Sequence, residues 1–299
     1  MILPAALARS LKEHLDLPGI VDAQSLDGGC IHTAARVDTP TGSIFCKWNV
    51  GAAGMGFGSE ARGLDALRAA AGSEGLVIPE VLGWRNAGVD EPGWLALAYL
   101  PASRPGPEYD EQLGRGLAAL HESVNEEWGW SEDNLIGALP QANPATERWD
   151  EFWTDARLGP QIERAVETGR IDAADRRLLE RTAAGTSRLL AAVEEDGPSI
   201  LHGDLWAGNV HAGPDGRPVL IDPAVYRGHR EVDLAMADLF GGLSGRAVAA
   251  YREAAPLIEG HVGRRPLYQL YYLLVHLNLF GPSYLEPCRR AARAASAAA

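Results

Sequence analysis

One stretch, Leu201 to Asn209, constrains this chain more than any other. It reads Leu-His-Gly-Asp-Leu-Trp-Ala-Gly-Asn, which places Asp204 and Asn209 on one loop behind an apolar entry. A second carboxylate, Asp222, directly follows the strand-like segment Pro218 to Ile221. A lone Asp beside Gly is usually a turn carboxylate that accepts backbone amide protons. The joint spacing of two carboxylates and an amide is rarer, and these are the oxygen ligands that Mg²⁺ prefers.

Phosphoryl transfer from ATP needs such a set. One carboxylate orients the attacking hydroxyl and takes its proton, while an amide and a second carboxylate hold Mg²⁺ on the phosphates. We therefore predict Asp204 as the catalytic residue, Asn209 and Asp222 as the metal ligands, and ATP and Mg²⁺ as the cofactors. The spacing resembles the catalytic loop and metal Asp of the protein-kinase-like fold, with His-Gly-Asp in place of His-Arg-Asp.

Two residues near the loop are predicted to support it. His202 precedes the catalytic Asp, and a His in that position more often holds backbone by hydrogen bonds than performs acid–base chemistry. Asp233 lies in the segment His229 to Ala235. We expect Asp233 to accept amide protons from the catalytic loop, which is a structural role.

A lysine on a strand is the candidate for binding the ATP phosphates. Alternation along Ile44 to Trp48 places Lys47 and Phe45 on one face of the strand. A single strand Lys is most often a solvated edge charge. Here Glu60 begins a helical stripe of inward-facing residues, and it is suitably placed to fix Lys47 against the α- and β-phosphates.

The segment Asp27 to Ala34, which contains Gly28-Gly29-Cys30 and His32, precedes this lysine strand. Glycines let backbone amides approach phosphate oxygens, so the segment is predicted to cover the nucleotide. A Gly-Gly pair also marks many hairpins. Cys30 is either a small apolar loop residue or, near phosphate-binding amides, a redox-sensitive thiol.

The order of elements indicates an α+β fold with two lobes. Residues 1–100 contain a helix over 1–19 and several strand-like segments. One main helix is predicted to start near Ser59, which would be its N-cap. The segment from Tyr99 to Pro107 is rich in Pro and Gly, and it is the predicted hinge. Tyr99 and Leu100 are expected to contact the nucleotide there. Residues 101–299 read as mostly helical, with an Ala-rich tail expected to fray. This predicts a bilobal protein-kinase-like fold: a nucleotide-binding N-lobe (1–100) with an antiparallel sheet, and a C-lobe (101–299) with the catalytic loop and acceptor site.

Composition limits the partners. The net charge of −13 argues against general affinity for nucleic acid or for an anionic membrane. No apolar run of about 18 residues is present, so no membrane span is expected. The three cysteines cannot all pair, and no signal peptide is evident, which favours a reducing, cytoplasmic setting. A monomer is expected rather than a dimer.

Three further residues are candidates for the acceptor site. Trp206 is either a core residue or, beside the catalytic Asp, a wall for a sugar or a cationic amine. His276 and Asn278 interrupt an apolar helix and are predicted to line the acceptor pocket. Only ten residues separate Asp222 from Asp233. A peptide-docking activation segment cannot fit there, which favours a small hydroxylated acceptor.

The amino-acid sequence resembles the bacterial fructosamine kinases, which are also called ketosamine-3-kinases. His-Gly-Asp with a following Asn is shared with aminoglycoside and choline kinases, and it is not specific. The specific combination is Asp204-Leu205-Trp206, the segment Gly228 to Glu231 and the segment Asn278 to Gly281.

The resemblance implies ATP-dependent phosphorylation of the 3-hydroxyl of a ketosamine, either a small molecule or a glycated lysine side chain. The unstable 3-phosphate then eliminates and frees the amine, so that the family is regarded as deglycating. The resemblance assigns Asp204 as catalytic, Asn209 and Asp222 as metal-binding and Lys47 as ATP-binding. Two alternatives remain: an aminoglycoside- or choline-type small-molecule kinase, and a non-catalytic nucleotide-binding module.

Overall fold

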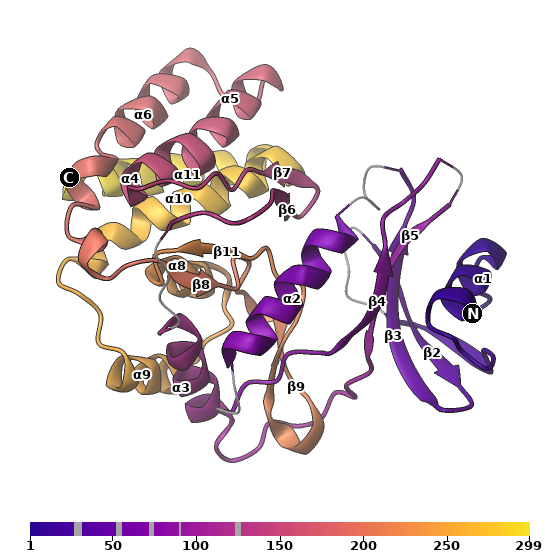
Figure 1. The fold of residues 1–299 in the computed structure, drawn as a ribbon. Coiled ribbons are helices and arrows are strands. Elements are labelled where there is room, and N and C mark those ends of the chain that lie inside the picture. The colour runs from indigo at the N-terminus through magenta and orange to yellow at the C-terminus, as the bar shows by residue number, and fades with distance from the viewer. Residues whose placement is uncertain (27–31, 52–55, 72–74, 90, 123–126) are drawn as a thin grey trace.

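The computed structural model describes residues 1–26, 32–51, 56–71, 75–89, 91–122 and 127–299. An antiparallel sheet with one helix on each face occupies the N-terminal part, and helices dominate the remainder (Figure 1). The fold class expected from the sequence is therefore confirmed. Among the described residues no helix combines the length and apolarity needed to cross a bilayer.

The N-terminal sheet has five strands in the order β1-β2-β3-β5-β4, and every neighbouring pair is antiparallel. The side chains of β3 alternate as predicted. Ile44, Cys46 and Trp48 pack into a core with Leu7 and Leu11 of α1, whereas Phe45 packs toward α2. The elements are α1 (Ala5–His14), β1 (Asp22–Leu26), β2 (Thr33–Thr39), β3 (Gly42–Asn49), α2 (Phe57–Ala71), β4 (Val81–Arg85) and β5 (Gly93–Ala98).

The two helices of this part begin or end differently from the prediction. Helix α1 ends at His14, because Asp16 adopts a left-handed conformation with φ of 49°. Helix α2 begins at Phe57, so Ser59 lies inside the helix and is not its N-cap. Instead, Asn86 accepts a hydrogen bond from the Gly58 amide at 2.9 Å. A residue distant in sequence thus satisfies one of the unpaired amides at the helix start.

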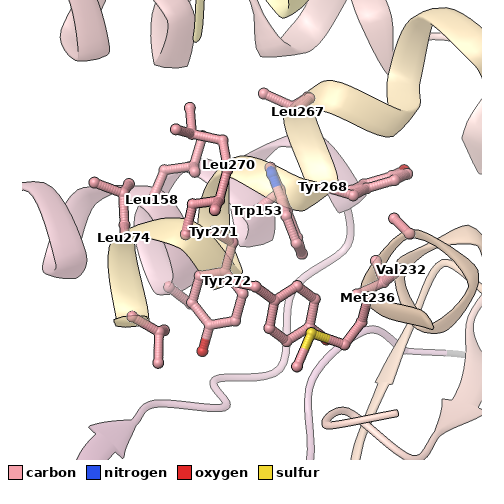
Figure 2. Close-up of a cluster of buried hydrophobic side chains, with 14 of the residues drawn as sticks. Trp153, Leu158, Val232, Met236, Leu267, Tyr268, Leu270, Tyr271, Tyr272 and Leu274 are labelled. Atoms are coloured by element: carbon pink, nitrogen blue, oxygen red, sulfur yellow. The ribbon is translucent and has the colours of Figure 1, made fainter. Parts of the chain in front are cut away.

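The C-terminal part is built around α10, whose buried aromatic and aliphatic side chains pack against Trp153 and Leu158 (Figure 2). The predicted fraying of the tail is wrong, because Cys288, Ala292 and Ala295 of α11 are buried in the same core. The helices are α3 (Tyr109–His121), α4 (Trp149–Phe152), a π-helix (Trp153–Leu158), α5 (Gly159–Glu167), α6 (Ala173–Ala184), α7 (Thr186–Leu189), α8 (Glu231–Phe240), α9 (Gly245–Ala254), α10 (His261–Phe280) and α11 (Leu285–Ala298).

Three short hairpin-like pairs interrupt these helices, and two of them frame the catalytic loop. Strand β8 pairs with β11, and β9 pairs with β10. An isolated bridge between Val77 and Val219 joins the N-terminal part to β10. The strands are β6 (Asn134–Ile136), β7 (Leu139–Gln141), β8 (Ser199–Leu201), β9 (Val210–Ala212), β10 (Pro218–Leu220) and β11 (Tyr226–Gly228).

Helices α3 and α9 cross at Gly114, and we expect Gly114→Ala to be strongly destabilising. An added Cβ there would lie 2.1 Å from the Ala247 carbonyl oxygen, which belongs to backbone and cannot turn aside. Overpacking of this kind costs about 3 kcal/mol of unfolding free energy, measurable by urea denaturation. The control is Gly245→Ala on α9, where nothing lies within 4 Å of the added Cβ. Equal stabilities for the two variants would contradict the tight crossing.

Candidate active site

The catalytic loop follows β8 and is shaped by a backbone crossing at Gly203. Gly203 has φ of +79°, and a Cβ there would lie 2.1 Å from the Ala224 carbonyl oxygen. The Ala224 amide in turn donates to the His202 carbonyl at 2.9 Å. Only glycine fits this position, because it accepts the left-handed conformation and leaves room for the neighbouring chain. The segment after Asp222 is thereby held beside the loop.

His202 links the same two segments with its side chain, as predicted. Its Nδ1 accepts from the Asp204 amide at 3.3 Å, and its Nε2 donates to the Ile221 carbonyl at 2.9 Å. Burial lowers the pKa of His202, which keeps the imidazole neutral. His202 therefore fixes the backbone around Asp204 and Asp222 and is not placed for proton transfer.

Asp233 of α8 holds the start of the loop, again as predicted. Its two carboxylate oxygens accept the amides of His202 and Gly203 at 2.8 and 2.9 Å. His121, at the end of α3, contacts the same carboxylate at 3.2 Å and the Tyr251 hydroxyl at 2.9 Å. Asp233 and His121 are both fully buried. A buried carboxylate with these partners orders the loop that carries Asp204.

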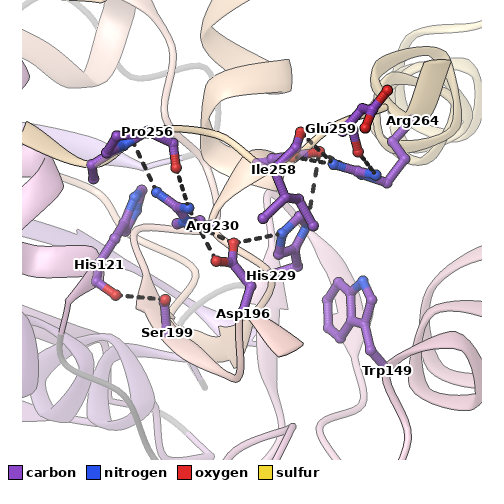
Figure 3. A network of polar contacts seen from close by, with 12 residues as sticks. His121, Trp149, Asp196, Ser199, His229, Arg230, Pro256, Ile258, Glu259 and Arg264 are labelled. Atoms are coloured by element: carbon purple, nitrogen blue, oxygen red, sulfur yellow. Dashed lines mark hydrogen bonds and ion pairs between the residues drawn. The ribbon is translucent and has the colours of Figure 1, made fainter. Parts of the chain in front are cut away.

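The first turn of α8 is itself anchored by a polar network (Figure 3). Arg230 binds both oxygens of Asp196, at 2.7 and 3.0 Å, and His229 contacts the same carboxylate at 3.1 Å. Glu231 forms a two-bond ion pair with Arg264 of α10. These paired charges fix the entry of α8, and hence the position of Asp233 two residues later.

Asp204, Asn209 and Asp222 come together at the mouth of the loop. The Asn209 amide nitrogen donates to the Asp204 carboxylate at 3.1 Å and to the Asp204 and Asp222 carbonyls at 2.9 and 3.3 Å. This leaves Asn209 Oδ1 as the side-chain atom available to a cation. Asp222 adopts a left-handed conformation with φ of 53°, which an Asp tolerates better than most residues. The site thus collects two carboxylates and one amide oxygen.

Lys47 reaches this cluster from the sheet. Its Nζ lies 2.8 Å from Glu60 of α2 and 2.8 Å from Asp222 Oδ1. The predicted pair of Lys47 with Glu60 is therefore present. Burial alone would lower the pKa of Lys47, but the two carboxylates more than offset this and raise it. Burial raises the pKa of Glu60 to about 7, although Lys47 opposes that change. The lysine is a fixed cation at the meeting point of the two parts.

The pKa of Asp204 gives a prediction for stability. Burial raises this pKa from 3.8 to about 7, so between these values the folded state binds more protons than the unfolded state. The free energy of unfolding then falls as pH rises through this range. We expect Asp204→Asn to have a higher Tm than the unsubstituted protein at pH 8, with a smaller difference at pH 5. A difference that is independent of pH would contradict this.

An aromatic rim adjoins the catalytic loop. The Trp206 side chain is 38% exposed, so it is not a core residue. The turn after α8 lies beside this loop: a Cβ added at Gly242 would be 3.1 Å from the Trp206 backbone, and one at Gly241 would be 3.4 Å from the Ala207 side chain. The preceding Phe240 stacks on His276 with ring centroids 4.3 Å apart. The structure thus places His276 close to the loop that carries Trp206.

The sequence model of the fructosamine kinase family matches residues 4–295. The chain belongs to the fructosamine kinase family. Among curated relatives, a probable ketoamine kinase of Synechocystis is 33% identical over 283 residues, covering 91% of this chain and 89% of its own. A chloroplastic protein-ribulosamine 3-kinase of Oryza sativa subsp. indica is 34% identical over 270 residues, covering 89% of this chain and 76% of its own.

Solved structures agree with this assignment. A candidate fructosamine-3-kinase from Thermobifida fusca has a TM-score of 0.85 and 36% identity, with 97% of this chain and 98% of that chain covered. The aminoglycoside phosphotransferase APH(4)-Ia, in a ternary complex with AMP-PNP and hygromycin B, has a TM-score of 0.62 at 16% identity over 97% and 99% of the chains. The second likeness supports the kinase-like fold alone.

The structure also places Asn278, Tyr99 and Leu100, which were predicted as site residues of this family member. Asn278 donates to the main-chain and side-chain oxygens of Gln161 at 3.0 and 2.9 Å, which ties α10 to α5. Its acceptor-binding role stays a prediction. Tyr99 and Leu100 follow β5, and the Tyr99 ring lies under Arg36 at 5.1 Å. Gly28, Gly29 and Cys30 lie outside the described residues.

Two residues near the site were missed by the sequence reasoning, and a third, His32, was predicted only as part of the phosphate-covering segment. His121 follows the leucine stripe of α3 and gave no separate signal. Tyr272, which donates to the Gly203 carbonyl at 2.8 Å, was not among the predicted site residues. His32 lies two residues before Ala34, which pairs with Lys47 across β2 and β3. The alternation that placed Lys47 would have placed His32 on the same face.

Proposed function

We propose that this fructosamine kinase family member transfers the γ-phosphoryl group of ATP to the 3-hydroxyl of a ketosamine. The observation that carries the proposal is the convergence of Lys47 and Asp222, 175 positions apart, at a 2.8 Å contact beside the Asp204 loop. Family membership and the ribulosamine 3-kinase relative support the acceptor class. Loss of the 3-phosphate by elimination would then free the amine.

Asp204 is proposed as the residue that orients the acceptor hydroxyl and takes its proton. The hydroxyl oxygen forms a bond to the γ-phosphorus, the bond from that phosphorus to the β–γ bridging oxygen breaks, and ADP leaves. The raised pKa of Asp204, about 7, suits proton acceptance near neutral pH. The hydrogen bond from the Asn209 amide to the Asp204 carboxylate, and the bond from the Asp204 backbone amide to His202 Nδ1, hold the Asp204 carboxylate in place.

Asn209 and Asp222 fit a Mg²⁺ ion. Both offer oxygen ligands, and no cluster of three His, Cys, Asp or Glu side chains that could hold a metal is found in the part of the chain that the structure describes. A site with few protein ligands suits Mg²⁺, which takes its remaining ligands from waters and substrate phosphates. When bound, the ion would neutralise charge on the phosphates.

The nucleotide is proposed to lie between residues 1–100 and residues 101–299, with Lys47 on its α- and β-phosphates and Tyr99 and Leu100 near its base. Glu60 and Asp222 hold the Lys47 ammonium at the meeting point of the two parts. Trp206 is proposed as a wall for the ketosamine, since it is exposed and follows Asp204 by two residues on the catalytic loop. His276 is proposed to extend this wall through its stacking on Phe240.

The test is ADP release with Mg-ATP across an acceptor panel. The panel contains ribulosyl-, erythrulosyl- and fructosyl-lysine, free and in a peptide, together with an aminoglycoside and choline. Turnover confined to the ketosamines is the expected result. Turnover with the aminoglycoside or choline alone would retain a kinase but reject a ketosamine acceptor.

A further inference from the structure

His32 lies on the same face of the sheet as Lys47. In the antiparallel register Ala34 pairs with Lys47, and paired side chains project from one face. Side chains two residues apart along a strand share a face, so Asn49 shares the face of Lys47 on β3, and His32, directly before β2, continues the face of Ala34. The contact between His32 and Asn49 at 3.4 Å agrees with this placement.

The hydrogen bonds of Asn49 fix the tautomer of His32. Asn49 Oδ1 accepts the Val50 amide at 2.8 Å, which orients the side-chain amide. Its Nδ2, a donor, therefore faces His32 Nδ1. Nδ1 must accept, and in a neutral imidazole the proton is then on Nε2. His32 consequently carries an N–H donor on the side of the ring away from Asn49.

That donor is not used within the part of the chain that the structure describes. Among the described residues His32 contacts Asn49 through Nδ1 and the Phe57 ring, whose centroid lies 4.9 Å away. The imidazole is partly exposed, and it lies close enough to Lys47 and Asp222 to feel both charges. Burial, followed by Lys47, lowers the pKa of His32 to about 4, so the ring is neutral at pH 7.

The sheet register also gives the order of groups along the cleft. Ala98, which leads into the predicted hinge, pairs with Ile44 at one end of β3. Lys47 lies further along the strand, and Asn49 lies at the far end, about 7 Å beyond Lys47. A nucleotide with its base at the hinge and its α- and β-phosphates at Lys47 would direct its γ-phosphate toward His32.

We propose that His32 donates a hydrogen bond from Nε2 to a γ-phosphate oxygen of ATP. This inference rests on the proposed function for the placement of the nucleotide. It assigns the far end of the β2–β3 pair a direct contact with the transferred group. His32 then adds a donor from the sheet side, opposite the carboxylates of the catalytic loop.

The test is calorimetric titration of the full chain with Mg²⁺ and AMP-PNP, and separately with Mg²⁺ and ADP, in the absence of an acceptor. His32→Ala is expected to weaken AMP-PNP binding about tenfold, the range for a hydrogen bond to a charged group, and to change ADP binding less than twofold. His32→Gln, which keeps a side-chain N–H donor, is expected to retain AMP-PNP binding. His14→Ala, on exposed helix α1, is the control and should bind both nucleotides normally.

The outcomes separate this inference from the proposed function. AMP-PNP binding by His32→Ala equal to that of the unsubstituted protein would overturn the contact, as would an equal loss of AMP-PNP and ADP affinity. If the unsubstituted protein binds AMP-PNP but phosphorylates no ketosamine, the acceptor proposal fails. The loss in His32→Ala would still establish the contact in that case.

Discussion

Asp204→Asn is expected to lower kcat about a thousandfold, because the variant keeps the size of the side chain but cannot accept the acceptor proton. Nucleotide affinity should change less than about threefold, since Lys47 and Glu60 remain paired in the cleft. The measurements are steady-state ADP release and binding of AMP-PNP. The same substitution should also raise Tm at pH 8, so a loss of kcat cannot be attributed to unfolding.

The matched control for this prediction is Asp215→Asn. Asp215 lies in the exposed turn between β9 and β10, and its left-handed conformation, with φ of 61°, is one that Asn also tolerates. Its kcat should equal that of the unsubstituted protein. A kcat for Asp204→Asn within tenfold of the unsubstituted value would mean that another group takes the proton.

Asp233→Ala is expected to have the largest effect on stability, about 4 kcal/mol of unfolding free energy. The substitution leaves the buried amides of His202 and Gly203 without an acceptor, at about 1–3 kcal/mol each. Because these amides begin the catalytic loop, kcat should fall as well. Urea denaturation measures the first effect, and ADP release measures the second. Asp233→Asn keeps one acceptor oxygen, so its unfolding free energy should lie between those of Asp233→Ala and the unsubstituted protein.

Asp238→Ala is the control on the same helix. Asp238 is exposed, and its ion pair with Arg265 at 3.4 Å is a surface pair that contributes little. Its unfolding free energy should change by less than about 0.5 kcal/mol. If Asp233→Ala behaved in the same way, the carboxylate would not be what orders the loop.

The parts of the site that the sequence predicts correctly depend on short spacing. Asp204 and Asn209 are on one loop, so their contact follows from local geometry. The pair of Lys47 and Glu60 follows from two periodicities, the alternation of a strand and the stripe of a helix. Asp233 was also predicted to accept amide protons from the catalytic loop, and its carboxylate does so.

The parts that the sequence does not predict depend on partners far along the chain. The start of α2 is set by Asn86, which no local pattern identifies as a cap. His121 meets Asp233 across 112 positions, and a single His after a leucine stripe carries no sign of that partner. The contact of the Asn278 amide with Gln161, 117 positions away, likewise has no signal in the sequence. In each case tertiary contacts decide the role of a polar side chain.

The most direct test of the central proposal is the structure of the product formed from ribulosyl-lysine and Mg-ATP. We expect one ADP per acceptor, a phosphorus resonance coupled to the proton on carbon 3 of the sugar, and subsequent release of free lysine. Phosphate on a different hydroxyl, or no phosphorylation of any ketosamine by a protein that binds ATP, would contradict the proposed 3-kinase activity.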